Sequence, residues 1–227
     1  MKFGFGRRMS EILFGAVAIA LMLSPVAHAE KYASIVVDAD TNEVLHARFA
    51  DEPRYPASLT KAMTLYMVFD ALKSGELTLS EDMPVSRAAA SQPPSNLRLT
   101  PGSTISVRDA IRALVTKSAN DVAVVIAERL GVTESRFATL MTAKAHALGM
   151  SRTTFRNASG LPDARQVSTA RDMAILAERL LEDHAGYYHY FSTDSFQWGS
   201  RKYPNHNALL NSVDGVDGIK TGYTRAS

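Results

Sequence analysis

The sequence contains no cysteine. Without thiols the chain can neither form a disulfide, nor use a thiolate nucleophile, nor bind zinc through sulfur. Histidine is scarce as well, with six residues, and none lie in an H-E-x-x-H or similar zinc-binding pattern. We therefore predict neither a metal nor a cofactor. Surface or core positions are the preferred interpretation of His46, His146, His184, His189 and His206.

An excess of charge of one sign is also missing. The chain has 25 Lys and Arg against 23 Asp and Glu, a net charge of +2. Residues 1–29 hold three of the basic residues and one of the acidic ones, so the remainder is neutral overall. A nucleic-acid partner therefore has no electrostatic support.

No apolar run is long enough to cross a bilayer, which takes about 20 residues. The longest candidate, residues 12–23, follows three basic residues and precedes the small-x-small sequence Ala27-His28-Ala29. This order predicts a signal peptide over residues 1–29, cleaved to leave Glu30, rather than an uncleaved anchor. We expect the protein to be exported to the periplasm or cell envelope.

Strand patterns occur near both ends, with helical patterns between them. Residues 34–38 and 44–48 predict a hairpin, and an apolar helix begins near Ser58 and ends at Gly75. Residues 76–185 are mostly helical, with capping boxes at Ser106 and Thr169. Residues 187–198 have β character, and residues 215–224 are a strand candidate. We expect a sheet lobe and a helical lobe that meet at a groove.

Three short motifs occur once each, in a fixed order. They are Ser58-Leu59-Thr60-Lys61, Ser118-Ala119-Asn120 and Lys220-Thr221-Gly222. Taken singly, each has an ordinary explanation, as a helix cap with a solvated lysine, a second helix cap and a protected edge strand. Those explanations do not account for the three motifs occurring together.

The first motif has the spacing of a serine nucleophile and its base. Residues three apart share one face of a helix, so Ser58 and Lys61 can meet there. A lysine accepts a proton only when neutral, which requires a lowered pKa. Burial would lower it, and Lys220 as a nearby cation would lower it further.

The other two motifs supply groups for proton relay and substrate binding. A hydroxyl at Ser118 can pass a proton to a leaving amine, and the Asn120 amide can hold a peptide carbonyl. Lys220 and Thr221 suit a substrate carboxylate, and Gly222 lets a substrate backbone approach closely.

With these motifs, the chain resembles the low-molecular-mass penicillin-binding proteins, which are serine D-alanyl-D-alanine carboxypeptidases. The resemblance runs from about Tyr32 onwards and includes Asn157-Ala158-Ser159-Gly160-Leu161-Pro162. It implies an α/β (α+β) fold of the serine β-lactamase and penicillin-binding-protein type, with an antiparallel sheet lobe and a helical lobe. Its implied substrate is a peptidoglycan stem peptide ending in D-Ala-D-Ala, and β-lactams are the implied covalent inhibitors.

The resemblance also implies a role for each motif residue. Ser58 would carry the acyl group, with Lys61 as base and Ser118 as proton relay. The implied substrate contacts are Asn120, Lys220, Thr221 and Gly222. The backbone N–H groups of Ser58 and Tyr223 would form the oxyanion hole.

The sequence stops five residues after Gly222, whereas family members continue through further strands. We therefore expect the catalytic domain over residues 30–227 to be incomplete at its C-terminus. Membrane attachment would be possible only through the missing part.

Three other functions compete with a carboxypeptidase. A D,D-endopeptidase uses the same site and stays open. A class A β-lactamase is less favoured, because no E-x-x-L-N segment lies between the second and third motifs. A catalytically idle binding module is disfavoured because every motif residue is present.

Overall fold

The structure is a computed structural model that describes residues 32–223. The predicted signal peptide, residues 1–29, lies outside this range. No helix within it is long and apolar enough to cross a membrane. The helices are η1 (Ala57–Leu59), α2 (Thr60–Ser74), α3 (Arg87–Ala90), α4 (Val107–Thr116), α5 (Asn120–Gly131), α6 (Glu134–Ala147), α7 (Ala170–Asp183), α8 (Ala185–Tyr188), η2 (His189–Ser192) and η3 (Ala208–Asn211). The strands are β1 (Ser34–Val37), β2 (Val44–Arg48), β3 (Asp82–Pro84), β4 (Thr104–Ser106), β5 (Ser195–Trp198) and β6 (Arg201–Pro204).

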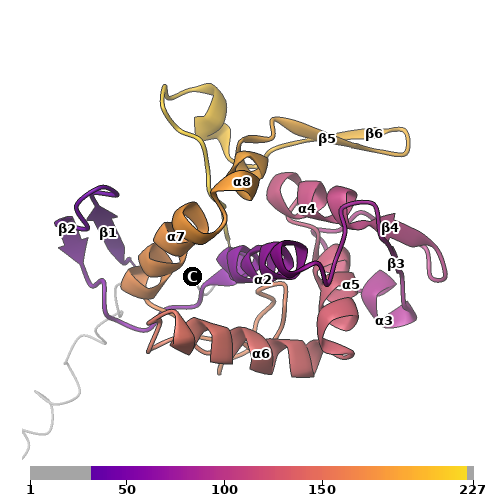
Figure 1. Cartoon of the computed structure of the whole chain (residues 1–227), viewed down its shortest axis with the longest axis horizontal. Helices are drawn as coiled ribbons and strands as arrows, with labels where there is room; N and C mark the ends of the chain where they lie inside the picture. The colour runs from indigo at the N-terminus through magenta and orange to yellow at the C-terminus, as the bar shows by residue number, and fades with distance from the viewer. Residues whose placement is uncertain (1–31, 224–227) are drawn as a thin grey trace, which may run out of the picture. The chain divides into compact units, whose positions relative to one another are not determined.

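Helix α2 forms the centre of the helical lobe. It contacts α4, α5, α6 and α7, which surround it in Figure 1. Met63, Leu65, Val68 and Phe69 are fully buried, and each such side chain contributes about 1.5–3 kcal/mol on burial. The helix ends at Gly75, whose φ of 77° is left-handed. The predicted buried helix is therefore confirmed, and it fixes the position of the residues at its N-terminus.

Two of the surrounding helices begin at the predicted caps. The Ser106 hydroxyl accepts the Asp109 N–H at 3.1 Å at the start of α4. The Thr169 hydroxyl accepts the Asp172 N–H at 3.0 Å at the start of α7. Each cap satisfies a backbone donor that a helix leaves unpaired. Both predicted capping positions are confirmed.

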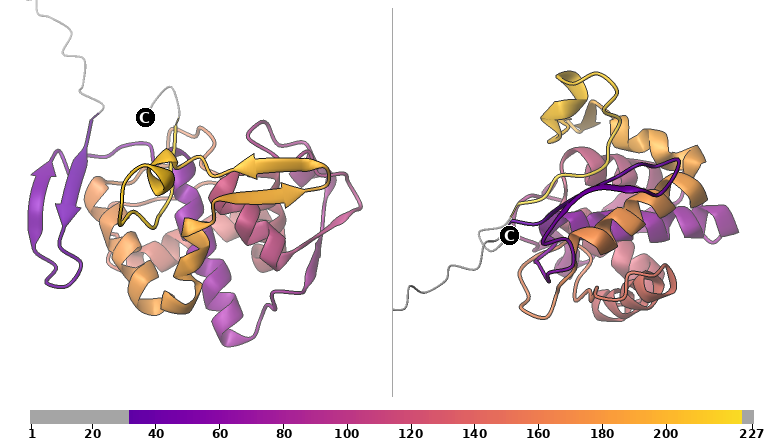
Figure 2. Two further views of the ribbon diagram at one scale, coloured as in Figure 1. Left: turned by 90° about the horizontal axis from the view of Figure 1, so that it is seen from above. Right: turned by 90° about the vertical axis from the view of Figure 1, so that its left-hand side faces the viewer.

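Within residues 32–223 the strands pair as three separate two-stranded antiparallel sheets, β1–β2, β3–β4 and β5–β6. The first joins Ser34 to Arg48 and Val37 to Val44, which confirms the hairpin predicted there. Figure 2 shows β5–β6 and β1–β2 as separate ribbons at different sides of the helices.

The prediction of β character over residues 187–198 is only half correct. Its first part forms α8 and η2, and only Ser195–Trp198 is a strand. The aromatic rings of Tyr187, Tyr190 and Phe191 all pack on Phe69 of α2. Helical spacing brings them to this one surface, whereas a strand would place alternate residues on opposite faces.

The predicted strand over residues 215–224 is wrong for the part that the structure describes. Residues 216–223 belong to no helix or strand, and none of the described strands pairs with them. A strand requires a neighbour for its backbone hydrogen bonds. The segment is held instead by the Asn207 amide, which donates to the Gly218 carbonyl at 3.3 Å.

Candidate active site

Lys61 lies fully buried at the N-terminal end of α2, with three oxygen atoms around its amine. Its Nζ is 3.3 Å from the Ser58 Oγ, one turn earlier. It donates to Asn120 Oδ1 at 2.8 Å and to the Ser159 carbonyl at 2.5 Å. Segments far apart in the sequence therefore meet at one amine.

The surroundings of Lys61 favour its neutral form. Burial is the main cause that lowers the pKa of Lys61 well below its ordinary range, and the Lys220 charge lowers it further. The buried carboxylate of Asp121 acts in the opposite direction. Both causes that the sequence predicted, burial and Lys220, are thus present.

Asn120 is held in place as the first residue of α5. Its backbone N–H donates to the Ser95 carbonyl at 2.7 Å, and its side-chain nitrogen donates to the Pro93 carbonyl at 2.9 Å. The second bond orients the amide, so that Oδ1 faces Lys61. The side-chain nitrogen retains a second N–H for a ligand. The contact between Asn120 and Lys61 was not predicted from the sequence.

Ser118 lies in the short connection between α4 and α5. It has a φ of 59°, uncommon for a residue with a side chain. Its hydroxyl is buried and has no hydrogen-bond partner among the described residues. An unsatisfied hydroxyl beside a cleft is available to a substrate or a transferred proton.

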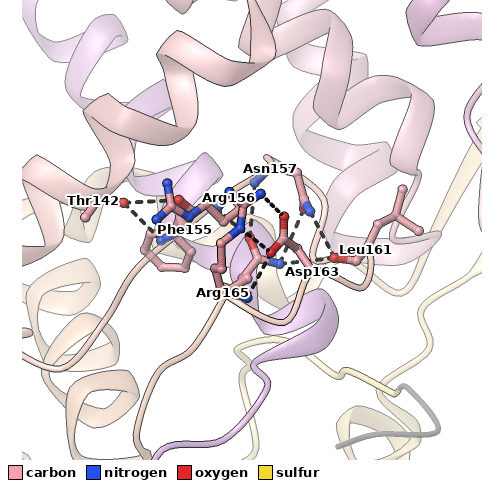
Figure 3. A network of polar contacts seen from close by, with 8 residues as sticks. Thr142, Phe155, Arg156, Asn157, Leu161, Asp163 and Arg165 are labelled. Atoms are coloured by element: carbon pink, nitrogen blue, oxygen red, sulfur yellow. Dashed lines mark hydrogen bonds and ion pairs between the residues drawn. The ribbon is translucent and has the colours of Figure 1, made fainter.

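The Ser159 carbonyl is positioned by a network of hydrogen bonds in residues 156–166. The buried Gln166 accepts the N–H groups of Arg156 and Asn157 at 2.9 and 3.2 Å. Asn157 Oδ1 then accepts the Gly160 N–H at 2.7 Å, and its amide donates to the Leu161 carbonyl at 2.9 Å. Figure 3 shows part of this network from close by, including the contact between Asn157 and Leu161.

Two further contacts fix this loop against its neighbours. Glu134, at the start of α6, accepts the Ala158 N–H at 3.0 Å. Gly160 has a φ of +85°, and a Cβ there would lie 1.8 Å from the Ala57 carbonyl oxygen. Only glycine allows this approach, which presses the loop against the residue that precedes Ser58.

The third motif lies opposite in a more open setting. Lys220 and Thr221 are half-buried, whereas Gly222 and Tyr223 are exposed. The Lys220 amine donates to the Thr221 carbonyl at 2.7 Å, and burial lowers the pKa of Lys220 to about 8. A Cβ on Gly222 would lie 3.2 Å from the Ser58 nitrogen, so this backbone closely approaches the nucleophile's end of η1.

A cleft of about 350 Å³ separates these walls. The predicted site residues that line it are Ser58, Ser118, Asn120, Thr221, Gly222 and Tyr223. The other two, Lys61 and Lys220, are not among the lining residues. A substrate in the cleft would therefore meet the hydroxyls and the amide, with both amines behind them.

Sequence reasoning assigned no role to several residues of the cleft, Ser159 and His206 among them. Ser159 contributes a backbone carbonyl, which no residue type reveals, although the Asn157–Pro162 stretch was noted. His206 also lines the cleft, although the sequence suggested a surface or core role for it. The neighbouring Asn205 and Asn207, which are typical of structured turns, were the available signal.

Penicillin-binding proteins are among the solved structures that are similar to this one. Penicillin binding protein 5 from Haemophilus influenzae has a TM-score of 0.81 and 33% identity, covering 85% of this chain and 57% of its own. Penicillin-Binding Protein D2 from Listeria monocytogenes, in its cefotaxime-bound form, has a TM-score of 0.76 and 35% identity, covering 86% and 79%. The α/β penicillin-binding-protein fold predicted from the motifs is thus confirmed.

The sequence profile of the D-alanyl-D-alanine carboxypeptidase family, Peptidase_S11, matches residues 22–227. The chain belongs to this family. It is 35% identical over 209 residues to D-alanyl-D-alanine carboxypeptidase DacF of Bacillus subtilis, covering 88% of this chain and 52% of that protein. A D-alanyl-D-alanine endopeptidase of Pseudomonas aeruginosa is 35% identical over 144 residues, or 63% of this chain and 45% of its own. The chain spans about half the length of these curated relatives.

Proposed function

We propose that the chain carries the catalytic centre of a serine-type D-Ala-D-Ala carboxypeptidase, which removes the terminal D-Ala from peptidoglycan stem pentapeptides. Family membership supports this reading, as do the three motifs that meet around one cleft. The cefotaxime-bound structure of a similar protein supports β-lactams as covalent inhibitors. With the predicted signal peptide, a peptidoglycan substrate also favours a periplasmic or cell-envelope location.

The observation that carries the proposal is the set of partners around Lys61. A neutral amine has two N–H donors and one lone pair. Asn120 and Ser159 offer two oxygens that only accept, so they take the two N–H groups. The lone pair is left for the third neighbour, the Ser58 hydroxyl, which can donate to it. This arrangement suits a lysine that acts as a base on serine.

The proposed reaction has two steps. The Ser58 oxygen attacks the carbonyl carbon of the penultimate D-Ala while its proton passes to Lys61. The C–N bond then breaks, and the leaving amine of the last D-Ala takes that proton through Ser118. Water next attacks the ester carbonyl while one of its protons passes to Lys61, and that proton moves on to the Ser58 oxygen as the ester C–O bond breaks, which releases the shortened peptide and restores the free hydroxyl. We assign the oxyanion hole to the N–H groups of Ser58 and Tyr223.

Cleavage of peptide cross-links is the second candidate, favoured by the similarity to an endopeptidase. The same bond chemistry serves both reactions. They differ in the amine that leaves, which is free D-Ala in one case and a peptide side chain in the other.

Labelling with fluorescent penicillin tests the nucleophile. We expect Ser58→Ala to abolish covalent labelling and D-Ala release from a pentapeptide, with no change in the circular dichroism spectrum. Ser200→Ala, at an exposed serine in the β5–β6 turn, is the control and should label normally. A penicilloyl adduct in the Ser58→Ala variant would refute the assignment. Release of D-Ala from pentapeptide, compared with cleavage of a cross-linked dimer, separates the two candidate functions.

A further inference from the structure

His206 lies where the second and third motifs come together. Its backbone N–H donates to the Thr116 carbonyl, at the end of α4, at 3.2 Å. The next residue, Asn207, donates to the Gly218 carbonyl in the segment that leads to Lys220. The turn around His206 therefore ties the end of α4 to the third motif, and it places His206 in the cleft wall.

Hydrogen bonds from the preceding residue, Asn205, fix the conformation of this turn. Asn205 donates to the Thr193 carbonyl at 2.9 Å and accepts the Asn207 N–H at 2.9 Å. Asn207 is buried, whereas His206 between the two asparagines is exposed. The two asparagines form the anchor, and the imidazole is left free to meet a ligand.

Two lysines act on His206, from the two elements that it joins. Lys117 follows α4, and Lys220 belongs to the third motif. Partial burial is the largest cause that lowers the pKa of His206, and the charges of Lys117 and Lys220 lower it further. At neutral pH the imidazole is therefore mainly uncharged, and protonation adds a third positive charge at this end of the cleft.

We propose that His206 is a specificity residue that binds the terminal carboxylate of the substrate and does so in its protonated form. This inference rests on the proposed function, because it requires a substrate that ends in a free carboxylate. An anion near Lys117 and Lys220 offsets the repulsion that opposes a charge on His206. Binding of the carboxylate and protonation of His206 therefore reinforce each other.

The direction of the pH effect follows from this coupling. A bound carboxylate raises the pKa of His206, so binding takes up a proton and strengthens as the pH falls. Between the pH at which His206 is fully protonated and the pH at which it is neutral, the affinity falls by about tenfold for each unit by which the carboxylate raises that pKa. Acylation has the opposite dependence, since Lys61 must be neutral to act as the base. Lower pH therefore strengthens substrate binding, whereas higher pH speeds acylation.

Nuclear magnetic resonance on the Ser58→Ala chain tests the binding step without acylation. The imidazole signals would be followed from about pH 5 to pH 8, where histidine titrates, with His206→Gln used for assignment. We expect N-acetyl-D-Ala-D-Ala to raise the pKa of His206, and its C-terminal amide to leave that pKa unchanged. The proposal would be overturned if saturating free acid left the pKa of His206 unchanged, or if the amide raised that pKa as much as the acid does. It would also be overturned if the free acid did not bind.

Kinetics of penicillin labelling at intact Ser58 provide the second readout. In the natural sequence, the dissociation constant of the initial complex should rise with pH. In His206→Gln it should be high and should not change with pH. In His206→Arg, which keeps a positive charge, it should stay low across the range. His46→Ala, a histidine in β2 outside the cleft residues, is the matched control and should behave like the natural sequence.

These outcomes distinguish failure of this inference from failure of the proposed function. If the natural chain is not labelled at all, the proposed function fails, and the magnetic resonance titration still decides whether His206 binds a carboxylate. If labelling is normal and His206→Gln has the pH dependence of the natural chain, the proposed function stands and the role of His206 is refuted.

Discussion

The two walls of the cleft are built differently. On the lysine wall, formed by Ser58, Lys61, Asn120 and Ser159, the base is fully buried and has three oxygen neighbours. On the opposite wall, residues 220–223 belong to no helix or strand, and none of the described strands pairs with them. A base with a lowered pKa requires burial and fixed partners, and both come from the helical lobe. Groups that only contact a ligand, such as the Thr221 hydroxyl and the Gly222 backbone, need no such burial, so a segment outside the helices can supply them.

The largest effect should come from the lysine wall. We expect Lys61→Met, which keeps the side-chain length but removes the base, to slow acylation by about 10²–10⁴-fold for every substrate. Rapid-quench labelling with penicillin measures this. Lys73→Met, at an exposed lysine near the end of the same helix, is the control. A similar loss in both variants would mean that the substitutions disturb α2 as a whole, not that Lys61 is the base.

Packing behind that wall can be tested at two glycines. Both Gly160 and Gly199 have a positive φ, but only Gly160 lies against another backbone. Replacing Gly199 by alanine should lower the free energy of unfolding by about 1–2 kcal/mol for the left-handed conformation alone. Gly160→Ala should cost about 1–3 kcal/mol more, because its Cβ meets the Ala57 carbonyl. Urea titration of both variants measures the difference, and equal losses would show that the close approach is unimportant.

A substitution in the opposite wall, residues 220–223, should have a smaller and more selective effect on catalysis. Lys220→Ala should lower kcat/KM for a free-acid substrate by roughly 10–100-fold, the range expected for a charge-assisted hydrogen bond. An amidated or esterified substrate should lose much less. Lys202→Ala, at an exposed lysine in β6, serves as control. Equal losses for both substrate types would refute a carboxylate role for Lys220.

The smallest expected effect is a shift of the pH profile of acylation, and it tests whether Lys220 on one wall changes the pKa of Lys61 on the other. Because the Lys220 charge lowers the pKa of Lys61, its removal should raise that pKa. Acylation requires neutral Lys61 and increases with pH through this pKa, so the acid limb should move to higher pH in Lys220→Ala. An ester substrate, measured across the pH range, isolates this shift from carboxylate binding. An unmoved acid limb would mean that the two lysines do not interact.

The sequence was most informative where chemistry depends on residues close in the chain. Ser58 and Lys61 are one helical turn apart, so their contact followed from helix geometry. The caps at Ser106 and Thr169 and the hairpin at residues 34–48 are also local features. Each is set by residue types within a few positions, and each is confirmed.

What the sequence did not reveal depends on segments that are far apart in the chain. The Ser159 carbonyl reaches Lys61 through a loop held by Gln166 and Glu134, and backbone carbonyls carry no residue signal. His206 has no motif of its own and enters the cleft only because its turn joins α4 to the third motif. The strand expected at residues 215–224 had a suitable composition, but composition does not supply a neighbouring strand.

The partner set of Lys61 has a consequence for the direction of one hydrogen bond. When the neutral Lys61 amine takes up a proton from solvent at low pH, it has three N–H groups and no lone pair. The third N–H must then point at the Ser58 oxygen, because Asn120 and Ser159 already hold the other two. Ser58 changes from donor to acceptor, and its own proton turns away from Lys61. Low pH therefore reverses the direction of the hydrogen bond between Ser58 and Lys61, in addition to lowering the fraction of Lys61 that is neutral.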